Sequence, residues 1–201
     1  ITNIRTVESF INEAEPDYII NFAAESHVDR SIEDPGVFIN TNIVGTYNLL
    51  FQSLDYFLKL KGSKKKNFRF THISTDEVYG SLDYEDSPFI EKSPYRPNSP
   101  YSASKASADM LLRSWFKTYN FPGIVTNSSN NYGPWQNPEK LIPRSIFLAL
   151  NNKPIEIYGD GKNVSNTPYL YKSCTDNAQP YGYENSDLKK VINIIVKSIN
   201  N

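Results

Sequence analysis

The stretch Ile73-Ser74-Thr75-Asp76-Glu77-Val78-Tyr79-Gly80 marks the end of a predicted strand. The run from Phe68 to Ser74 alternates apolar with polar residues and is rich in β-formers, which predicts a strand. A hydroxyl and two consecutive carboxylates then follow at its end. In an open α/β sheet, ligands bind beyond the carboxyl ends of the strands. We therefore expect an α/β fold with a site at this edge.

A second polar group follows after a proline-containing loop. Tyr101 and Lys105 are four residues apart in a segment of helix formers, so a helix would place them on one face. A cation beside a phenol favours the phenolate and lowers its pKa. Such a tyrosine can take a proton from an alcohol while the alcohol loses a hydride. Taken alone, such a pair is more often part of a capped surface helix with an ordinary exposed lysine, because short motif matches have a high false-positive rate.

Helical and strand patterns alternate along the chain, which favours a parallel sheet flanked by helices. The sequence predicts helices over residues 6–15, 35–60 and 99–119, and strands over 17–22, 68–74 and 122–126. We place the domain boundary at residue 150. Residues 1–150 form the part with the catalytic candidates, and 151–201 form a degraded region ending in a helix.

Composition excludes several classes of protein. The chain has 201 residues and a net charge of −1, so no basic surface for nucleic acid is implied. No apolar run reaches membrane-spanning length. The single cysteine, Cys174, fits a reducing, cytoplasmic compartment. His27 has no partner at metal-ligand spacing, so we expect no metal site.

Two motifs together carry a family resemblance. Ser74–Gly80 followed by Tyr101-x-x-x-Lys105 resembles the extended short-chain dehydrogenase/reductases. Within them the chain is most similar to the nucleotide-sugar 4,6-dehydratases, those acting on dTDP-glucose in particular. The resemblance covers residues 1–164. It implies the second half of a Rossmann-like, doubly wound parallel sheet, a partial substrate-binding region, and NAD as the cofactor.

The resemblance also implies a set of site residues. The catalytic residues would be Thr75, Asp76, Glu77, Tyr101 and Lys105. The cofactor would lie on Phe22, Ala23, Ala24, Glu25, Ser26, Thr41, Tyr101, Lys105 and Asn131. The nucleotide sugar, dTDP-glucose or UDP-glucose, would contact Ser26, Thr75, Asn130, Lys140, Leu141 and Tyr158. Family members commonly dimerise through the two long helices, here 35–60 and 99–119, and their apolar stripes permit a homodimer.

The family's reaction assigns a role to each catalytic residue. Tyr101, assisted by Lys105 and Thr75, would take the proton of the sugar's C4 hydroxyl as hydride passes to NAD. Glu77 would then remove the C5 proton, and Asp76 would protonate the departing C6 hydroxyl. The hydride would return to C6, leaving a 4-keto-6-deoxy sugar.

The sequence departs from the family's pattern at two places, which leaves alternative functions open. The sequence contains no glycine-rich phosphate loop, and it begins in the helix before what would be the family's fourth strand. The strand at 18–22 should therefore be an apolar sheet edge. After Val164 the resemblance ends, and Ser165 stands where the family has an arginine. The alternatives are an epimerase or decarboxylase of the same superfamily, and an inactive truncated remnant or fragment.

Overall fold

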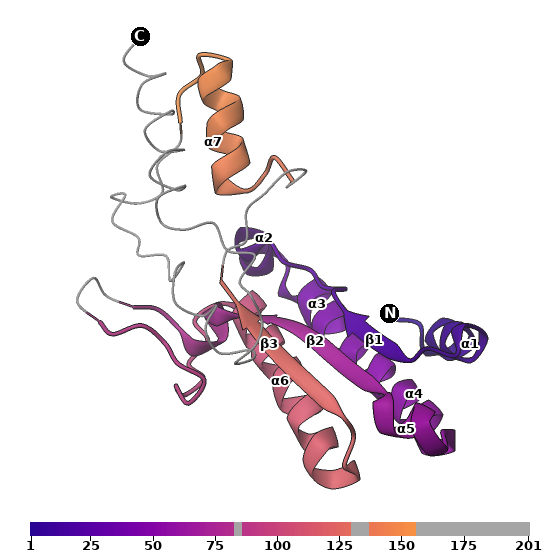
Figure 1. Cartoon of the computed structure of the whole chain (residues 1–201). Coiled ribbons are helices and arrows are strands. Elements are labelled where there is room, and N and C mark those ends of the chain that lie inside the picture. The colour runs from indigo at the N-terminus through magenta and orange to yellow at the C-terminus, as the bar shows by residue number, and fades with distance from the viewer. Residues whose placement is uncertain (83–85, 130–136, 156–201) are drawn as a thin grey trace. The chain divides into compact units, whose positions relative to one another are not determined.

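The computed structural model describes residues 1–82, 86–129 and 137–155. The chain divides into two units: Ile1–Ser81 with Phe89–Ser128, and Leu82–Pro88 with Ser129–Asn201. The first unit contains α1 (Ile4–Ala14), β1 (Tyr18–Asn21), α2 (Val28–Glu33), α3 (Pro35–Phe38), a π-helical segment (Ile39–Gly45), α4 (Thr46–Lys59), α5 (Gly62–Asn67), β2 (Arg69–Thr75), a 3₁₀ turn (Asp76–Tyr79), α6 (Pro100–Tyr119) and β3 (Gly123–Ser128). The second contains α7 (Leu141–Leu150) (Figure 1).

The three strands form one parallel sheet in the order β1-β2-β3. Asn21 on β1 pairs in register with His72 on β2, and Thr75 on β2 pairs with Ser128 on β3. This arrangement confirms the predicted α/β class. All three strands run in one direction, so their carboxyl ends, including the end that carries Thr75, lie at the same edge.

The strand β1 lies at the edge of the described sheet, as expected. Tyr18, Ile20 and Phe22 are 64%, 56% and 71% exposed. Ile19, whose side chain points to the opposite face, packs against the core. The expectation of an apolar edge at residues 18–22 is therefore confirmed.

The helical stretch after Asp34 begins where the sequence predicts. The Asp34 side chain accepts a 3.2 Å hydrogen bond from the Gly36 N–H, and Pro35 occupies the first turn. The single predicted helix over 35–60 was wrong, however, because residues 39–45 are π-helical. A π turn inserts an extra residue, which rotates the side chains that follow it. Here the segment carries Thr41 and the buried Asn42.

The helix α6 confirms the prediction over 99–119. Ser99 and Ser102 form a reciprocal capping box, each side chain accepting a 3.0 Å bond from the other's backbone N–H. Pro100 follows the cap, and Asn120 ends the helix in the left-handed region at φ 51°. The position of Tyr101 in the first turn is thereby set by local sequence.

The core of the first unit is aromatic. Phe57, Phe68, Phe70 and Phe121 contact one another with ring centroids 5.6 to 6.1 Å apart. Burying each phenylalanine contributes about 1.5–3 kcal/mol. Residues of α1, α4 and α6 pack on this cluster.

Within the described residues, no helix is long and apolar enough to cross a membrane.

The second unit is described over a short range. Its helix α7 follows Lys140, and Leu141, the first helical residue, is 66% exposed. Asn130, Asn131 and Tyr158, three of the predicted contact residues, lie outside the described residues. The domain boundary expected at residue 150 stays a prediction.

Candidate active site

The predicted carboxylate pair lies at the carboxyl end of β2. Thr75 ends the strand, and its hydroxyl oxygen accepts a 3.3 Å bond from the Glu77 N–H, which caps the 3₁₀ turn. The same hydroxyl donates to the Asp76 carboxylate at 3.4 Å. Thr75 and Asp76 are buried, whereas Glu77 is half-buried.

The two adjacent carboxyl groups have different environments. Burial raises the pKa of Asp76, and hydrogen bonds from Thr75 and from backbone N–H groups partly oppose the shift. A carboxyl with a raised pKa holds its proton more readily and suits a proton donor. A more accessible neighbour suits a base, so the pair can divide the acid and base roles.

Tyr101 comes close to this carboxylate pair. Burial and the charge of Glu77 raise the pKa of Tyr101 to about 12, while a hydrogen bond with Thr75 lowers it. The ring also packs edge-on against Phe38, with centroids 6.3 Å apart. The expectation that Lys105 lowers this pKa was wrong: burial beside carboxylates outweighs any nearby cation.

Lys105 is buried, and its ammonium group is directed at β2. The Nζ atom donates a 2.6 Å bond to the Ile73 carbonyl, and the residue is 3% exposed. Burial lowers the pKa of Lys105 to about 8, and the charge of Asp109 partly opposes the shift. The reading of Lys105 as an ordinary surface lysine is therefore wrong.

Two buried asparagines, which the sequence analysis missed, hold the loop after β1. Asn21 Oδ1 accepts a 3.1 Å bond from the Ala23 N–H. Asn42 accepts from the Glu25 N–H at 2.9 Å and donates to the Glu25 carbonyl at 3.0 Å and to Ser104 Oγ at 2.8 Å. The predicted cofactor loop is thus anchored to the helices, with small side chains at positions 23 and 24. Thr41, beside Asn42, is half-buried.

His72 and Asp109 were also missed. Both are 1% exposed and lie beside Lys105. The His72 Nε2 atom is 3.4 Å from Lys105 Nζ and 3.6 Å from Asp109 Oδ1. The spacing of Lys105 and Asp109 is a full helical turn, so their proximity could have been inferred from sequence. The contribution of His72 depends on strand register, which the sequence does not show.

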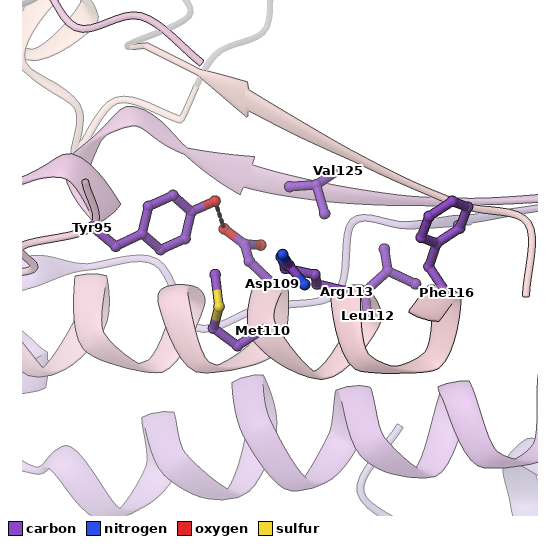
Figure 2. A pocket seen from close by; sticks show the side chains of 8 residues that line it. Tyr95, Asp109, Met110, Leu112, Arg113, Phe116 and Val125 are labelled. Atoms are coloured by element: carbon purple, nitrogen blue, oxygen red, sulfur yellow. Dashed lines mark hydrogen bonds between the residues drawn. The ribbon is translucent and has the colours of Figure 1, made fainter. Parts of the chain in front are cut away.

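A pocket of about 240 Å³ opens beside α6 and β3 (Figure 2). Tyr95 and Asp109 line it at one end, and the Tyr95 hydroxyl donates a 3.1 Å bond to Asp109 Oδ2.

Among the described residues, no group of three His, Cys, Asp or Glu side chains could hold a metal ion.

Comparison with known proteins gives one consistent result. The family model described as GDP-mannose 4,6 dehydratase matches residues 1–170. A dTDP-glucose 4,6-dehydratase from Xanthomonas campestris pv. campestris (strain B100) is 53% identical over 168 residues, covering 84% of this chain and 48% of the relative. The same enzyme from Neisseria meningitidis serogroup B is 57% identical over 149 residues, covering 74% of this chain and 42% of the relative.

Solved structures agree with these relatives. A dTDP-glucose 4,6-dehydratase from Streptomyces venezuelae, solved with NAD and TYD bound, superposes with a TM-score of 0.72 at 42% identity. The match covers 82% of this chain and 47% of the chain in that structure. The chain thus spans about half the length of the curated relatives it matches. The residues that the family model matches, 1–170, include the strand end with Thr75, and the chain belongs to the GDP-mannose 4,6 dehydratase family.

Proposed function

We propose that this chain carries the catalytic half of an NAD-dependent dTDP-glucose 4,6-dehydratase. The observation that supports it best is the placement of Thr75, Asp76 and Glu77 against Tyr101. Both groups act on the Tyr101 phenol: the charge of Glu77 raises its pKa, and hydrogen bonding with Thr75 lowers it. An epimerase needs a base for the C4 hydroxyl but no acid–base pair for elimination, so the two carboxylates favour the dehydratase.

The residues of the first unit fit the nicotinamide end of NAD. The loop 22–26 follows β1 directly, its backbone is held by Asn21 and Asn42, and alanines at 23 and 24 leave room for a flat ring. Within this unit, Thr41, Tyr101 and Lys105 would complete the contact; Asn131, outside the described residues, is a further cofactor contact that the resemblance implies. NAD, when bound, supplies a hydride acceptor for C4 and later a hydride donor for C6.

The side chains perform the proton transfers. Tyr101, hydrogen-bonded to Thr75, would accept the proton of the C4 hydroxyl as its phenolate, which requires its pKa to fall from about 12 when NAD and the sugar are bound. The resulting C4 ketone makes the C5 hydrogen acidic, and Glu77 removes it. Asp76, whose pKa is raised, donates a proton to the C6 hydroxyl, which leaves as water. Reduction at C6, together with a proton returned to C5 by Glu77, balances the oxidation at C4, so the net change is loss of one water.

The partners proposed here follow from the relatives. The sugar nucleotide would be held by Ser26, Thr75, Asn130, Lys140, Leu141 and Tyr158. The relatives named for dTDP-glucose favour that nucleotide over UDP. A homodimer would use the outer faces of α4 and α6, where Phe51 and Tyr119 are 46% and 47% exposed. Cys174 supports a cytoplasmic location.

The test is a chimera in which residues 1–164 replace the matching half of the Xanthomonas campestris relative. In deuterium oxide, the dehydratase proposal predicts a 4-keto-6-deoxy sugar that has gained deuterium at C5. A C4-epimerised sugar that keeps its C6 oxygen would instead identify an epimerase. A folded chimera that binds NAD and leaves the sugar unchanged would identify a catalytically inactive half.

A further inference from the structure

A buried histidine lies between two charged groups beneath the candidate site. His72, on β2, is 1% exposed. Its Nε2 atom is 3.4 Å from Lys105 Nζ and 3.6 Å from Asp109 Oδ1. Nε2 can donate to the carboxylate or accept from the ammonium, and the choice depends on which ring nitrogen carries the proton.

Asn21 determines that choice. Its Oδ1 accepts from the Ala23 N–H at 3.1 Å, which sets the orientation of the amide. Its Nδ2 therefore faces His72 Nδ1 at 3.1 Å. Since an amide nitrogen is a donor, Nδ1 must accept, and the imidazole proton is on Nε2.

With the proton on Nε2, the imidazole N–H faces the Asp109 carboxylate at 3.6 Å. Lys105 Nζ is a donor, so it forms no hydrogen bond with Nε2–H and donates to the Ile73 carbonyl at 2.6 Å. Asp109 Oδ2 accepts from Ser74 Oγ at 2.7 Å and from Tyr95 at 3.1 Å. Oδ1 has no hydrogen-bond partner within the described residues and faces the imidazole N–H.

These contacts favour the ionised carboxylate. Hydrogen bonds to a charged carboxylate stabilise the charge, and Lys105, one helical turn before Asp109, is the opposite charge. Burial raises the pKa of Asp109 to about 6, so the group is still ionised at neutral pH. Its charge in turn favours the protonated Lys105.

We propose that His72 is a positioning residue that keeps Asp109 ionised as the buried counter-charge of Lys105, and that Asn21 selects the tautomer this requires. The inference rests on the proposed function for the role of Lys105 beside Tyr101. Because Asn21 also binds the Ala23 N–H, one side chain links the predicted cofactor loop to the charge state of the lysine.

The first experiment observes the tautomer directly, in the unsubstituted chain. The sequence has two histidines, so ¹⁵N imidazole spectra are simple, and a His27→Gln variant assigns them. The groups facing His72 are Asn21 from β1, Lys105 and Asp109 from α6, and Tyr95 beyond Asp109. We expect His72 to be neutral with the proton on Nε2 from about pH 5 to about pH 8. A proton on Nδ1, or an imidazolium in that range, would overturn the proposal.

The second experiment measures the charge state of the buried Lys105 from the ¹⁵N chemical shift of its Nζ atom against pH, with the exposed Lys117 as internal control. His72→Phe removes the imidazole N–H that faces Asp109 Oδ1 at 3.6 Å, so the pH at which Lys105 is half-protonated should fall by about one unit. His72→Gln keeps an N–H donor, so the pH at which Lys105 is half-protonated should stay near that of the unsubstituted chain. Asp109→Asn should abolish the difference between the two variants.

Equal Lys105 titration curves for the Phe and Gln variants in an otherwise unchanged chain would contradict the proposal. If the Phe variant does not fold, the tautomer measurement on the unsubstituted chain still tests the proposal, because a proton on Nδ1 would overturn it. Neither experiment uses NAD or a sugar nucleotide, so a chain that proves to be no dehydratase would leave this result intact, and the reverse also holds.

Discussion

The ammonium group of Lys105 donates a 2.6 Å hydrogen bond to the carbonyl of Ile73, two residues before Thr75. The helix that carries Tyr101 is thereby joined to the strand that carries the carboxylate pair. Helix and strand come from segments separated by a long loop, and this partly buried hydrogen bond joins them at the candidate site.

Tyr101→Phe should abolish oxidation at C4 in the chimera. The substitution keeps the ring that contacts Phe38 and removes the proton acceptor, which commonly costs roughly two to four orders of magnitude in rate. Rapid-mix absorbance of the reduced nicotinamide reports the step. Tyr119→Phe, on the exposed end of the same helix, is the matched control and should be unaffected. Normal appearance of the signal in Tyr101→Phe would exclude the assigned role.

Asp76→Asn and Glu77→Gln should both permit oxidation at C4 and stall elimination. Glu77→Gln should lose exchange of the C5 proton with solvent deuterium, because the base is gone. Asp76→Asn should retain part of that exchange, because it removes the acid. Mass spectrometry of recovered sugar distinguishes them, and Glu8→Gln on the exposed face of α1 is the control. Full product formation by either variant would be incompatible with the assignment.

Asp109 should make the chain less stable as pH rises. Its pKa is raised from 3.8 to about 6, so the folded state binds the proton more tightly than the unfolded state. The associated stability is fully present below about pH 4 and is lost as pH rises through about 6, amounting to at most roughly 3 kcal/mol. Asp109→Asn should flatten the free energy of unfolding over that window in urea titrations. An unchanged slope would show that the carboxyl is not perturbed.

Lys105 should also make the free energy of unfolding depend on pH, but in a higher pH range and with the opposite sign. Its pKa is lowered from 10.5 to about 8, so its stability contribution is present above the unfolded value and lost as pH falls through about 8. Lys105→Met, which keeps the length of the side chain without the charge, should remove this dependence. Lys117→Met, at an exposed position of α6, should leave it in place.

Gly123→Ala should destabilise the first unit. A Cβ at this position would lie 2.3 Å from Leu112 Cδ1, and overpacking of this kind typically costs about 1–3 kcal/mol. Leu112→Ala removes the obstructing atoms, so the two substitutions together should cost less than their sum. Thermal unfolding of the four proteins tests the cycle. Strict additivity would mean that the close approach of helix and strand is not what requires glycine.

The chain of 201 residues by itself should bind NAD more weakly than micromolar and should not turn over a nucleotide sugar. The predicted contacts serve the nicotinamide end, and the sequence contains no glycine-rich turn for the pyrophosphate. Losing several charge-assisted bonds at roughly 1.5–3 kcal/mol each weakens binding by orders of magnitude. Calorimetric titration measures it, and a micromolar dissociation constant would refute the prediction.

The exposed edge strand should also promote self-association. Ile20→Lys places a charge at a 56% exposed position of β1 and should raise the concentration at which the chain remains monomeric. Lys is depleted in strands but common on protected edges, so folding should persist. Light scattering against concentration compares the variant with the unsubstituted chain.

The amino-acid sequence by itself predicted the three strands, α1 and α6, but not α2, α5 or the π-helical segment, and the roles of the site residues came from the family resemblance. Capping residues such as Asp34 and Ser99 act on their own helices, and alternation in 68–74 depends on neighbours in sequence, so both could be read locally. The same holds for the spacing of Tyr101 and Lys105.

The tertiary structure alone decided the direction in which Lys105 points, the raised pKa of Tyr101, and the partnership of His72 with Asp109. Each depends on which strand lies under α6 and in which register. Burial is a property of the packed chain, and desolvation shifts a pKa by amounts that sequence spacing does not contain. The π-helical segment likewise arises where Asn42 bonds to a loop and a helix distant in the sequence.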